Sequence, residues 1–336
     1  MQDIADMAGV SRMTVSLALR NQSGVSEETR KRIRKIALKL DYHPDAMLAS
    51  LSAYRRVIKP PAYTGTLGWI TMESNKDEWK HGWSGKLRMH QGAYERANKL
   101  GYKLDEFWFN KDEMTAQRFS SILKARNIRG LIFLSTPGPG KKLDMNWSQF
   151  SCVGLGYTLS EPQFHAINDD SGFAVNIALR KLKESGHKKI GMTLSAVAHE
   201  KVMEDWIGSY YQSMHRMFPG TKFRILTKDR IYKEDFLKWL DKNQPDSLIS
   251  HAPELVVRWL NEEGYKVPGD ISLTGVGVEP DQRFAGVTQN SLGIGQSAVD
   301  ALVGMIHRDE VGVPESPLRI LLEGHWMDGN TIARRQ

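Results

Sequence analysis

The chain has 336 residues, of which 40% are hydrophobic and 25% are charged, and this length is sufficient for about two or three globular cores. No apolar run approaches the roughly 18 residues of a membrane span, and the first residues do not match a secretory signal. The one cysteine, Cys152, excludes an internal disulfide and a multi-cysteine zinc site. Together these features predict a cytoplasmic protein without a membrane partner.

The net charge of +7 is concentrated near the N-terminus. Residues 1–60 hold 11 Lys and Arg against 6 Asp and Glu, whereas the remainder holds 35 against 33. A basic head on a nearly neutral body is typical of a protein that binds a polyanion such as DNA. A solvated, charged helix is the alternative explanation of the charge alone.

The first forty residues predict three short helices. The first ends at Gly9, Ser11 is a natural N-cap for a second helix over residues 12–19, and a third helix begins after Ser26. The residues predicted to face a common core are Ile4, Ala5, Ala8, Val15, Ala18, Leu19, Ile33, Ile36, Ala37 and Leu40. Those predicted to face outward are Arg12, Met13, Ser16, Leu17, Arg30, Lys31, Arg34 and Lys35. A helix, a glycine turn and a second helix form the helix-turn-helix unit, whose second helix enters the DNA major groove.

The amino-acid sequence of this segment resembles that of a known family. "DIADMAGVSRMTVSLALRN", residues 3–21, resembles the opening of the LacI/GalR (lactose-repressor) family. "VSEETRKRIRKIALKLDYHPDAMLASL" resembles the third helix, the Tyr-x-Pro turn and the hinge helix of that family. The resemblance implies a DNA-binding domain at 1–45, a hinge helix and linker at 46–60, and an effector-binding and dimerisation domain at 61–336.

The resemblance also implies which residues contact DNA. They are Ser11, Arg12, Met13, Thr14, Ser16, Leu17, Tyr42 and Leu51. Arg12 is able to form a bidentate pair with guanine, whereas Met13 and Leu17 can only pack on thymine methyls or sugars. Leu51 matches a leucine that wedges into the minor groove, although packing of the apolar hinge residues against the body is the alternative. The remaining positions match phosphate contacts, which set the register of the protein on DNA.

The body alternates between short apolar strands and amphipathic helices. Strands are predicted at 67–70, 103–108, 130–134, 151–154, 189–193, 223–226, 247–250 and 271–275. Helices are predicted at 93–100, 119–125, 174–184, 210–217, 236–240 and 255–261. This alternation predicts parallel sheets with helices on both faces, and so many strands favour two subdomains with a cleft between them. Ligands of such folds bind beyond the carboxyl ends of the strands.

Sequence motifs that resemble those of the family also occur in the body, as in "LKESGHKKIG" and "EEGYKVPGDISLTGVG". The family's sensor is similar to periplasmic sugar-binding proteins, so the resemblance implies an α/β fold: an all-α helix-turn-helix headpiece plus a periplasmic-binding-protein-like sensor of two doubly wound parallel-sheet subdomains. The N-subdomain is expected at about 61–158 plus 290–320, and the C-subdomain at about 159–289 plus 321–336.

The predicted cleft departs from the family pattern. Asp205 stands where the family usually has an arginine, and Gly277 stands where it usually has an aspartate, so neither usual ligand clamp is present. The candidate ligand-binding residues in the strand-end loops are Asn75, Trp79, Trp83, Ser135, Asp169, His199, Asp205 and Trp206. Aromatic faces with carboxylates and amides suit a neutral carbohydrate, although ordinary packing is the alternative for each tryptophan and for His199.

Motifs of catalysis are missing from the sequence. The histidines show no HExxH spacing, and no dinucleotide fingerprint, phosphate loop or nucleophile elbow is present. We therefore expect no catalytic residue, cofactor or metal, and a protein that is not an enzyme. The predicted function is a sequence-specific transcriptional regulator, most simply a repressor. It would bind a pseudo-palindromic double-stranded DNA operator as a homodimer under the control of a small sugar. The alternatives are a solute-binding or sugar-processing protein with an accessory head, and a regulator with an orphan sensor domain that responds to a protein partner.

Overall fold

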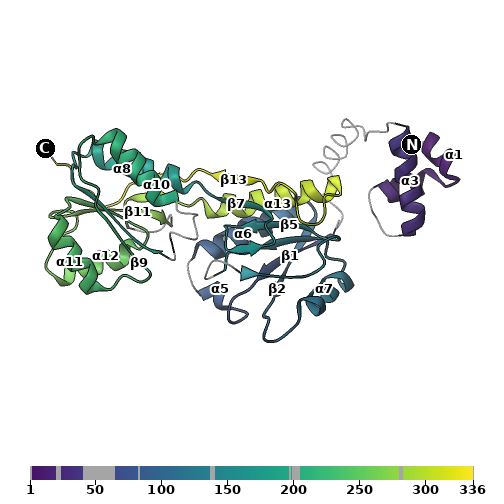
Figure 1. Ribbon diagram of the computed structural model, residues 1–336, viewed down its shortest axis with the longest axis horizontal. Coiled ribbons are helices and arrows are strands. Elements are labelled where there is room, and N and C mark those ends of the chain that lie inside the picture. The colour runs from purple at the N-terminus through teal and green to yellow at the C-terminus, as the bar shows by residue number, and fades with distance from the viewer. Residues whose placement is uncertain are drawn as a thin grey trace.

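The computed structural model describes residues 2–19, 24–40, 65–81, 84–136, 141–196, 198, 205–279 and 283–335. Along the chain these residues form a small helical headpiece and two α/β subdomains, with the headpiece and the second subdomain at opposite ends of the molecule (Figure 1). Over the described ranges, no helix is long and apolar enough to cross a membrane.

The headpiece contains three helices around one core. They are α1 (Gln2–Ala8), α2 (Arg12–Leu19) and α3 (Glu27–Lys39). Gly9 has a φ of +63°, the left-handed conformation that glycine adopts at low cost after a helix. The core residues are Ile4, Ala5, Ala8, Val15, Ala18, Ile33 and Ala37, all from the predicted inward set. The three-helix prediction is therefore confirmed.

Two side chains of α3 and its end differ from the prediction. Arg30 was expected to face outward, but it is 6% exposed, donates a hydrogen bond to the Val25 carbonyl at 3.3 Å and pairs with Glu27 at 3.6 Å. A long aliphatic stem allows arginine to cover apolar surface while its guanidinium finds local oxygen partners. Leu40 was expected inside and is exposed, because α3 ends one residue earlier and no described element covers it.

The first subdomain is built on a six-stranded parallel sheet in the order β13-β7-β5-β3-β1-β2. Its strands are β1 (Gly65–Thr71), β2 (Tyr102–Trp108), β3 (Gly130–Phe133), β5 (Ser151–Leu155), β7 (His165–Asp169) and β13 (Arg319–Leu322). Its helices are α5 (Glu78–His81), α6 (Gly85–Lys99), α7 (Ala116–Ala125) and α13 (Ser291–Arg308). A small two-stranded sheet pairs β4 (Lys141–Lys142) with β6 (Leu159–Glu161).

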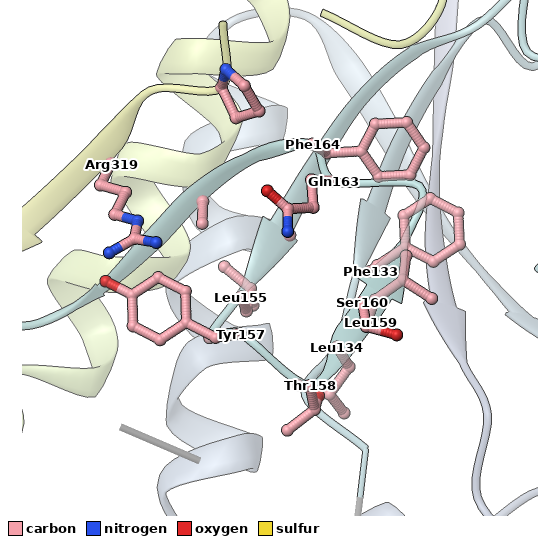
Figure 2. A pocket seen from close by; sticks show the side chains of 14 residues that line it. Phe133, Leu134, Leu155, Tyr157, Thr158, Leu159, Ser160, Gln163, Phe164 and Arg319 are labelled. Carbon is pink, nitrogen blue, oxygen red and sulfur yellow. The ribbon is translucent and has the colours of Figure 1, made fainter. Parts of the chain in front are cut away.

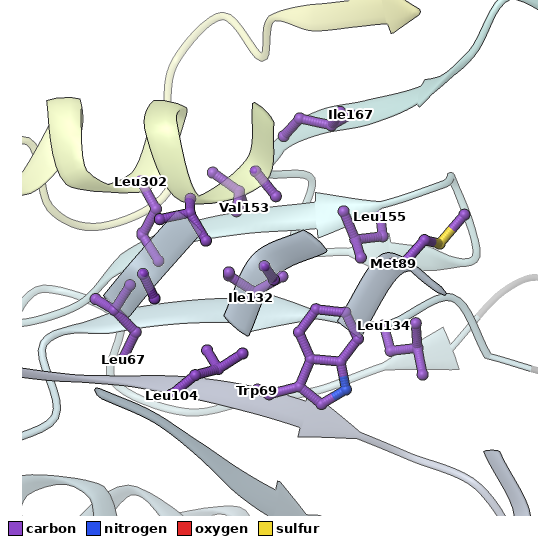
Figure 3. Close-up of a cluster of buried hydrophobic side chains, with 14 of the residues drawn as sticks. Leu67, Trp69, Met89, Leu104, Ile132, Leu134, Val153, Leu155, Ile167 and Leu302 are labelled. Atoms are coloured by element: carbon purple, nitrogen blue, oxygen red, sulfur yellow. The ribbon is translucent and has the colours of Figure 1, made fainter. Parts of the chain in front are cut away.

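One core of this subdomain lies between the sheet and the helix pair α6 and α13 (Figure 3). Strand residues such as Trp69 and Ile132 contribute to it, and Leu302 of α13 covers them. The two helices approach so closely that a Cβ atom on Gly92 or Gly295 would overlap backbone atoms of the other helix. Glycine at these positions is therefore a packing requirement.

The second subdomain contains the other six-stranded sheet, in the order β14-β12-β11-β10-β8-β9. Its strands are β8 (Ile190–Ser195), β9 (Ile225–Lys228), β10 (Ser247–Ser250), β11 (Ser272–Val278), β12 (Gly286–Thr288) and β14 (Trp326–Met327), of which only β14 is antiparallel to its neighbour. Its helices are α8 (Ser171–Glu184), α10 (Asp205–Met217), α11 (Lys233–Asn243) and α12 (Pro253–Glu262). Two doubly wound subdomains, as predicted, make up the sensor.

The chain passes between the subdomains three times: from β7 to α8, from β12 to α13 and from β13 to β14. Because α8 follows β7 after one residue, the carboxyl ends of the first sheet face the second subdomain. By the same reasoning at β12 and α13, the carboxyl ends of the second sheet face the first. The first sheet includes β7 and so continues past residue 158, where the sequence placed the end of the N-subdomain.

Candidate DNA-binding and ligand-binding sites

The second headpiece helix begins with a side-chain cap. The Ser11 hydroxyl oxygen accepts a hydrogen bond from the Thr14 backbone N–H at 3.1 Å and lies 2.9 Å from the Thr14 hydroxyl. Both residues were predicted to contact phosphates, and here their hydroxyls fix the first turn of α2. The helix N-terminus that they form carries a partial positive charge, which favours a phosphate nearby.

The face of α2 opposite the core carries the predicted base contacts. Val15 and Ala18 are fully buried, whereas Arg12 is exposed and Met13 is 73% exposed. Among the described residues no carboxylate forms an ion pair with the exposed Arg12 guanidinium, which carries five N–H donors. Leu17 lies at the edge of this face and is half-buried.

The other predicted DNA contacts are divided between the described and undescribed residues. Ser16 is half-buried on α2, whereas Tyr42, Leu51 and the predicted hinge at 46–60 lie outside the described residues. On α3, Arg34 forms an ion pair with Asp309 at the end of α13, while Lys31 and Lys35 are exposed. These exposed cations extend the basic surface beyond α2.

At the junction of the subdomains, the first sheet presents a buried carboxylate that the sequence did not single out. Glu73 follows the end of β1, its side chain is 2% exposed, and it pairs with Lys86 in the first turn of α6. Its second oxygen, Oε2, has no hydrogen-bond partner among the described residues. A buried carboxylate oxygen without a donor is costly, and it is therefore an acceptor available to a ligand hydroxyl.

Hydroxyls and a phenol follow the ends of β3 and β5. The Thr158 hydroxyl accepts a hydrogen bond from the Thr136 N–H at 2.7 Å and donates one to the Ser135 hydroxyl at 3.4 Å. Burial raises the pKa of the nearby Tyr157 phenol; Arg319 lowers it, and Asp205 of the second subdomain raises it again. The predicted residues Ser135 and Asp205 are thus on opposite sides of one junction.

Asp169 lies where the chain leaves β7 for the second subdomain. Its carboxylate accepts hydrogen bonds from the Ser171 hydroxyl at 3.1 Å and from the Gln289 amide at 3.2 Å. Gln289 belongs to the β12-to-α13 connection, so the pair links two of the three chain crossings. Burial raises the pKa of Asp169 from 3.8 to about 6, although both hydrogen bonds oppose this effect. Gln289 Oε1 is buried and has no hydrogen-bond partner in the described part of the chain.

A second ion pair spans the junction. Arg88 of α6 lies 3.4 Å from Glu279, which directly follows β11 of the second subdomain. Glu279 is 3% exposed and also accepts a hydrogen bond from the Ser291 hydroxyl at 3.5 Å. The first turn of α6 therefore binds one buried carboxylate in each subdomain, through Lys86 and Arg88.

The predicted aromatic residues do not form a common stacking surface. Trp79 is 2% exposed and packs in the first-subdomain core against Trp69 and His90, with ring centroids 6.1 and 5.1 Å away. Its indole faces are occupied by protein, so the proposed stacking role does not fit its position. Trp83 and His199 lie outside the described residues.

Trp206 and Asn75 also differ from the expected arrangement. Trp206, the second residue of α10, is 6% exposed in the core of the second subdomain, 6.0 Å from the ring of His251. Its indole Nε1 has no hydrogen-bond partner among the described residues, so a donor remains available. Asn75 is exposed in the turn before α5, where its backbone N–H bonds Glu78 at 3.4 Å.

Two pockets lie near the strand ends. The first, about 150 Å³, lies at the end of β5 with Tyr157 and Arg319 on one side and Phe133 and Phe164 on the other (Figure 2). The second, about 240 Å³, lies at the ends of β8, β9 and β10. No group of three or more His, Cys, Asp or Glu residues that could hold a metal ion occurs within the described ranges.

Sequence reasoning missed most of the polar residues at the junction. Those that the structure adds are Glu73, Lys86, Arg88, Tyr157, Thr193 and Gln289. Several of them follow a strand by one or two residues, and this position in the sequence could have identified them as candidate site residues. Lys86 and Arg88 carry no such signal, because they belong to an amphipathic helix whose orientation only the fold decides.

Comparison with known proteins gives matches at both ends of the chain. The family described as bacterial regulatory proteins, lacI family, matches residues 1–45, and the periplasmic binding protein-like domain matches residues 179–329. The HTH-type transcriptional regulator MalR of Streptococcus pneumoniae serotype 4 is 26% identical over 318 residues, which is 91% of this chain and 92% of MalR.

Solved structures share the fold over nearly the whole length. A transcriptional regulator CelR–cellobiose complex has a TM-score of 0.60 and 18% identity, with 98% of both chains covered. The lac repressor dimer bound to operator and the anti-inducer ONPF has a TM-score of 0.60 and 16% identity, again with 98% of both chains covered.

Proposed function

The chain belongs to the lacI family of bacterial regulatory proteins, and we propose that it binds a specific DNA operator under the control of a small, neutral carbohydrate. The observation that carries the proposal is the pairing of two features in one chain. A three-helix headpiece presents Arg12 and Met13 on the outer face of α2, and a two-subdomain sensor gathers unsatisfied polar atoms at its junction. The first suits the major groove, and the second suits a hydroxyl-rich ligand.

The regulator acts as a homodimer on a pseudo-palindromic site. One headpiece places only a few side chains on base edges, so strong and specific binding needs two headpieces on two half-sites. The lac repressor, which shares this fold, has been solved as a dimer bound to operator. Such a protein works where the chromosome is, in the cytoplasm, and MalR is named as a regulator and not as an enzyme.

The charges at the junction favour a neutral ligand. Glu73 Oε2 and Gln289 Oε1 are acceptors without donors among the described residues, and Asp205 adds a negative charge at the start of α10. Hydroxyl groups donate to such acceptors, whereas a ligand carboxylate would meet like charge. CelR, which shares this fold, has been solved as a complex with cellobiose, which agrees with a sugar effector.

Ligand binding would reach the headpiece through the three chain crossings. A ligand that contacts both subdomains changes their relative orientation, and Asp169, Gln289, Arg88 and Glu279 are among the described residues that join them. A change in orientation moves the first subdomains of the dimer and so the spacing of the two headpieces.

The test begins with selection of an operator from random duplexes by the full-length protein. Fluorescence anisotropy then measures affinity against salt and against a panel of neutral sugars. We expect a steep fall with salt, because several phosphates are neutralised, and a change in operator affinity with at least one sugar. Arg216→Ala, which removes an exposed arginine of α10 far along the chain from the headpiece, is the matched control for Arg12→Ala. Failure to enrich any duplex, or affinity independent of salt, would refute DNA binding.

A further inference from the structure

The smaller pocket, of about 150 Å³, lies against one face of the first sheet (Figure 2). Val153 and Ile167 point into the core that α6 and α13 cover, so the residues that alternate with them, Gly154 and Ala166, point to the opposite face, where they line the pocket. Every residue that lines it belongs to the first subdomain or to the connection that leads into β13. The pocket is therefore a different cavity from the junction, to which both subdomains contribute.

Four residues in register form the floor of this pocket. Phe133 is paired with Gly154, Gly154 with Ala166, and Ala166 with Arg319, so they form one row across β3, β5, β7 and β13. Neighbouring strands are about 4.8 Å apart, which puts the two ends of the row about 14 Å apart. The two residues in the middle of the row have little or no side chain. A Cβ atom on Gly154 would lie 3.7 Å from its nearest contact, the Gly156 carbonyl oxygen, so a larger side chain there would extend into the hollow.

One end of the row carries a positive charge. Arg319 is the only charged residue among those that line the pocket, and it is exposed, with its guanidinium 5.1 Å from the centre of the Tyr157 ring. Among the described residues no carboxylate forms an ion pair with it. Asp169 and Asp205 influence the pKa of Tyr157, but neither of them lines the pocket. The lining therefore has a net charge of one cation.

The other end of the row is apolar. The rings of Phe133 and Phe164 stack there with centroids 5.5 Å apart and close the pocket. Half-buried Leu159 and exposed Pro317 add apolar surface that a ligand can reach. Gln163 is exposed between the two ends, where its amide can donate a hydrogen bond (Figure 2).

We propose that this pocket is a second ligand site, which binds a small carboxylate with one apolar ring. The carboxylate pairs with the guanidinium of Arg319, whose parallel N–H donors match its two oxygens. The ring lies over Gly154 and Ala166 and points toward Phe164. A lining with one cation and no carboxylate selects an anion over a neutral analogue, and the apolar end selects a ring over a small hydrated anion. The volume is below the roughly 300–1,000 Å³ of drug-sized sites, as suits a single ring. This inference does not depend on the proposed sugar effector.

The experiment measures Kd by calorimetry on the full-length protein. The probes are benzoate, benzamide and acetate. We expect benzoate to bind at least about tenfold more tightly than either of the others, because benzamide lacks the charge that Arg319 pairs with and acetate lacks the ring.

Variants at the two parts of the row locate the binding site. Arg319→Gln should weaken benzoate binding by about tenfold and leave benzamide binding unchanged, since only the charge is lost. Arg118→Gln is the matched control, because Arg118 is an exposed arginine on α7 of the same subdomain that does not line the pocket. Gly154→Val fills the hollow and should weaken both ring probes by at least about tenfold.

The outcomes separate this inference from the proposed function. A preference for benzoate that Arg319→Gln removes and Arg118→Gln retains supports the pocket. Equal affinity for benzoate and benzamide, no binding of benzoate, or an equal loss in Arg118→Gln overturns it, whereas operator binding and the response to sugars are measured without these probes and stand. A sharp two-state unfolding transition for each variant excludes misfolding as the reason for a loss. Because Arg319 is exposed, its replacement decides the question even if Gly154→Val does not fold.

Discussion

Replacement of Asp169 by asparagine should abolish a pH dependence that is built into the junction. Burial raises the pKa of Asp169 from 3.8 to about 6, so the folded protein holds this proton more tightly than the unfolded chain does. The resulting stabilisation is complete below the unfolded pKa and is lost as pH rises through about 6. A pKa about two units higher in the folded state corresponds to about 3 kcal/mol of unfolding free energy, lost between about pH 4 and pH 7.

Asparagine suits this site because its hydrogen-bond partners can adapt. The Gln289 amide still donates to the side-chain oxygen, and the Ser171 hydroxyl, which donates to Asp169, accepts from an asparagine amide after rotation. We therefore expect Asp169→Asn to match the parent near pH 4.5. At pH 8 it should be more stable by about 1–3 kcal/mol, the range that remains if one hydrogen bond is weakened.

The assay is guanidinium unfolding followed by tryptophan fluorescence at half-unit steps from pH 4.5 to 8. Asp241→Asn, at an exposed position on α11, is the control and should follow the parent at every pH. Parallel stability curves for the parent and Asp169→Asn across this range would show that Asp169 does not titrate as its burial requires.

Four further predictions concern the headpiece, the junction and the ligand. Arg12→Ala should cost about 1–3 kcal/mol at one operator guanine, measured by anisotropy on base-substituted operators; equal weakening on all operators would make Arg12 a phosphate contact. Arg88→Ala should destabilise the protein by about 1–3 kcal/mol in urea, more than Glu279→Gln does, because it removes the cation beside a buried carboxylate; the reverse order would contradict this. Gly295→Ala should cost about 1–3 kcal/mol by overpacking the α6–α13 contact, and thermal unfolding at or above the parent value would refute that. A uronic acid should bind more weakly than its neutral parent sugar in calorimetry, given Asp205, and tighter binding would overturn the charge argument.

The headpiece was the part most accessible from sequence. Its helices are short, their ends carry local signals such as Gly9 and Ser26, and its small core needs only the spacing of a few apolar residues. Local sequence signals suffice to predict these helices, because each helix begins and ends at residues determined by their neighbours in the chain. Arg30 and Leu40 are the exceptions. The burial of Arg30 depends on the Val25 carbonyl across the turn before α3, and Leu40 follows the end of α3 and is exposed.

The sensor's architecture was also predicted, since alternating strands and helices impose parallel sheets with ligands at the strand ends. One edge of the first sheet, β13, was not, whereas the other edge, β2, was predicted at 103–108. β13 comes from a segment about 150 residues beyond its partner β7 in the chain. Its side chains are largely exposed, so the sequence has no apolar alternation there that would predict a strand.

Only the tertiary structure determined which side chains form the ligand-binding surface. A tryptophan in a strand-end loop has the same sequence signal whether it packs inward or lines a site, and Trp79 packs inward because Trp69 and His90 meet it there. Conversely, Glu73 and Glu279 are identified as candidate site residues only by their ion pairs with Lys86 and Arg88. These two cations belong to one turn of α6 and contact a carboxylate in each subdomain. Sequence determines which side chains stand near a strand end; which of them are left without a partner follows from contacts between segments up to 200 residues apart, and these exist only in the folded chain.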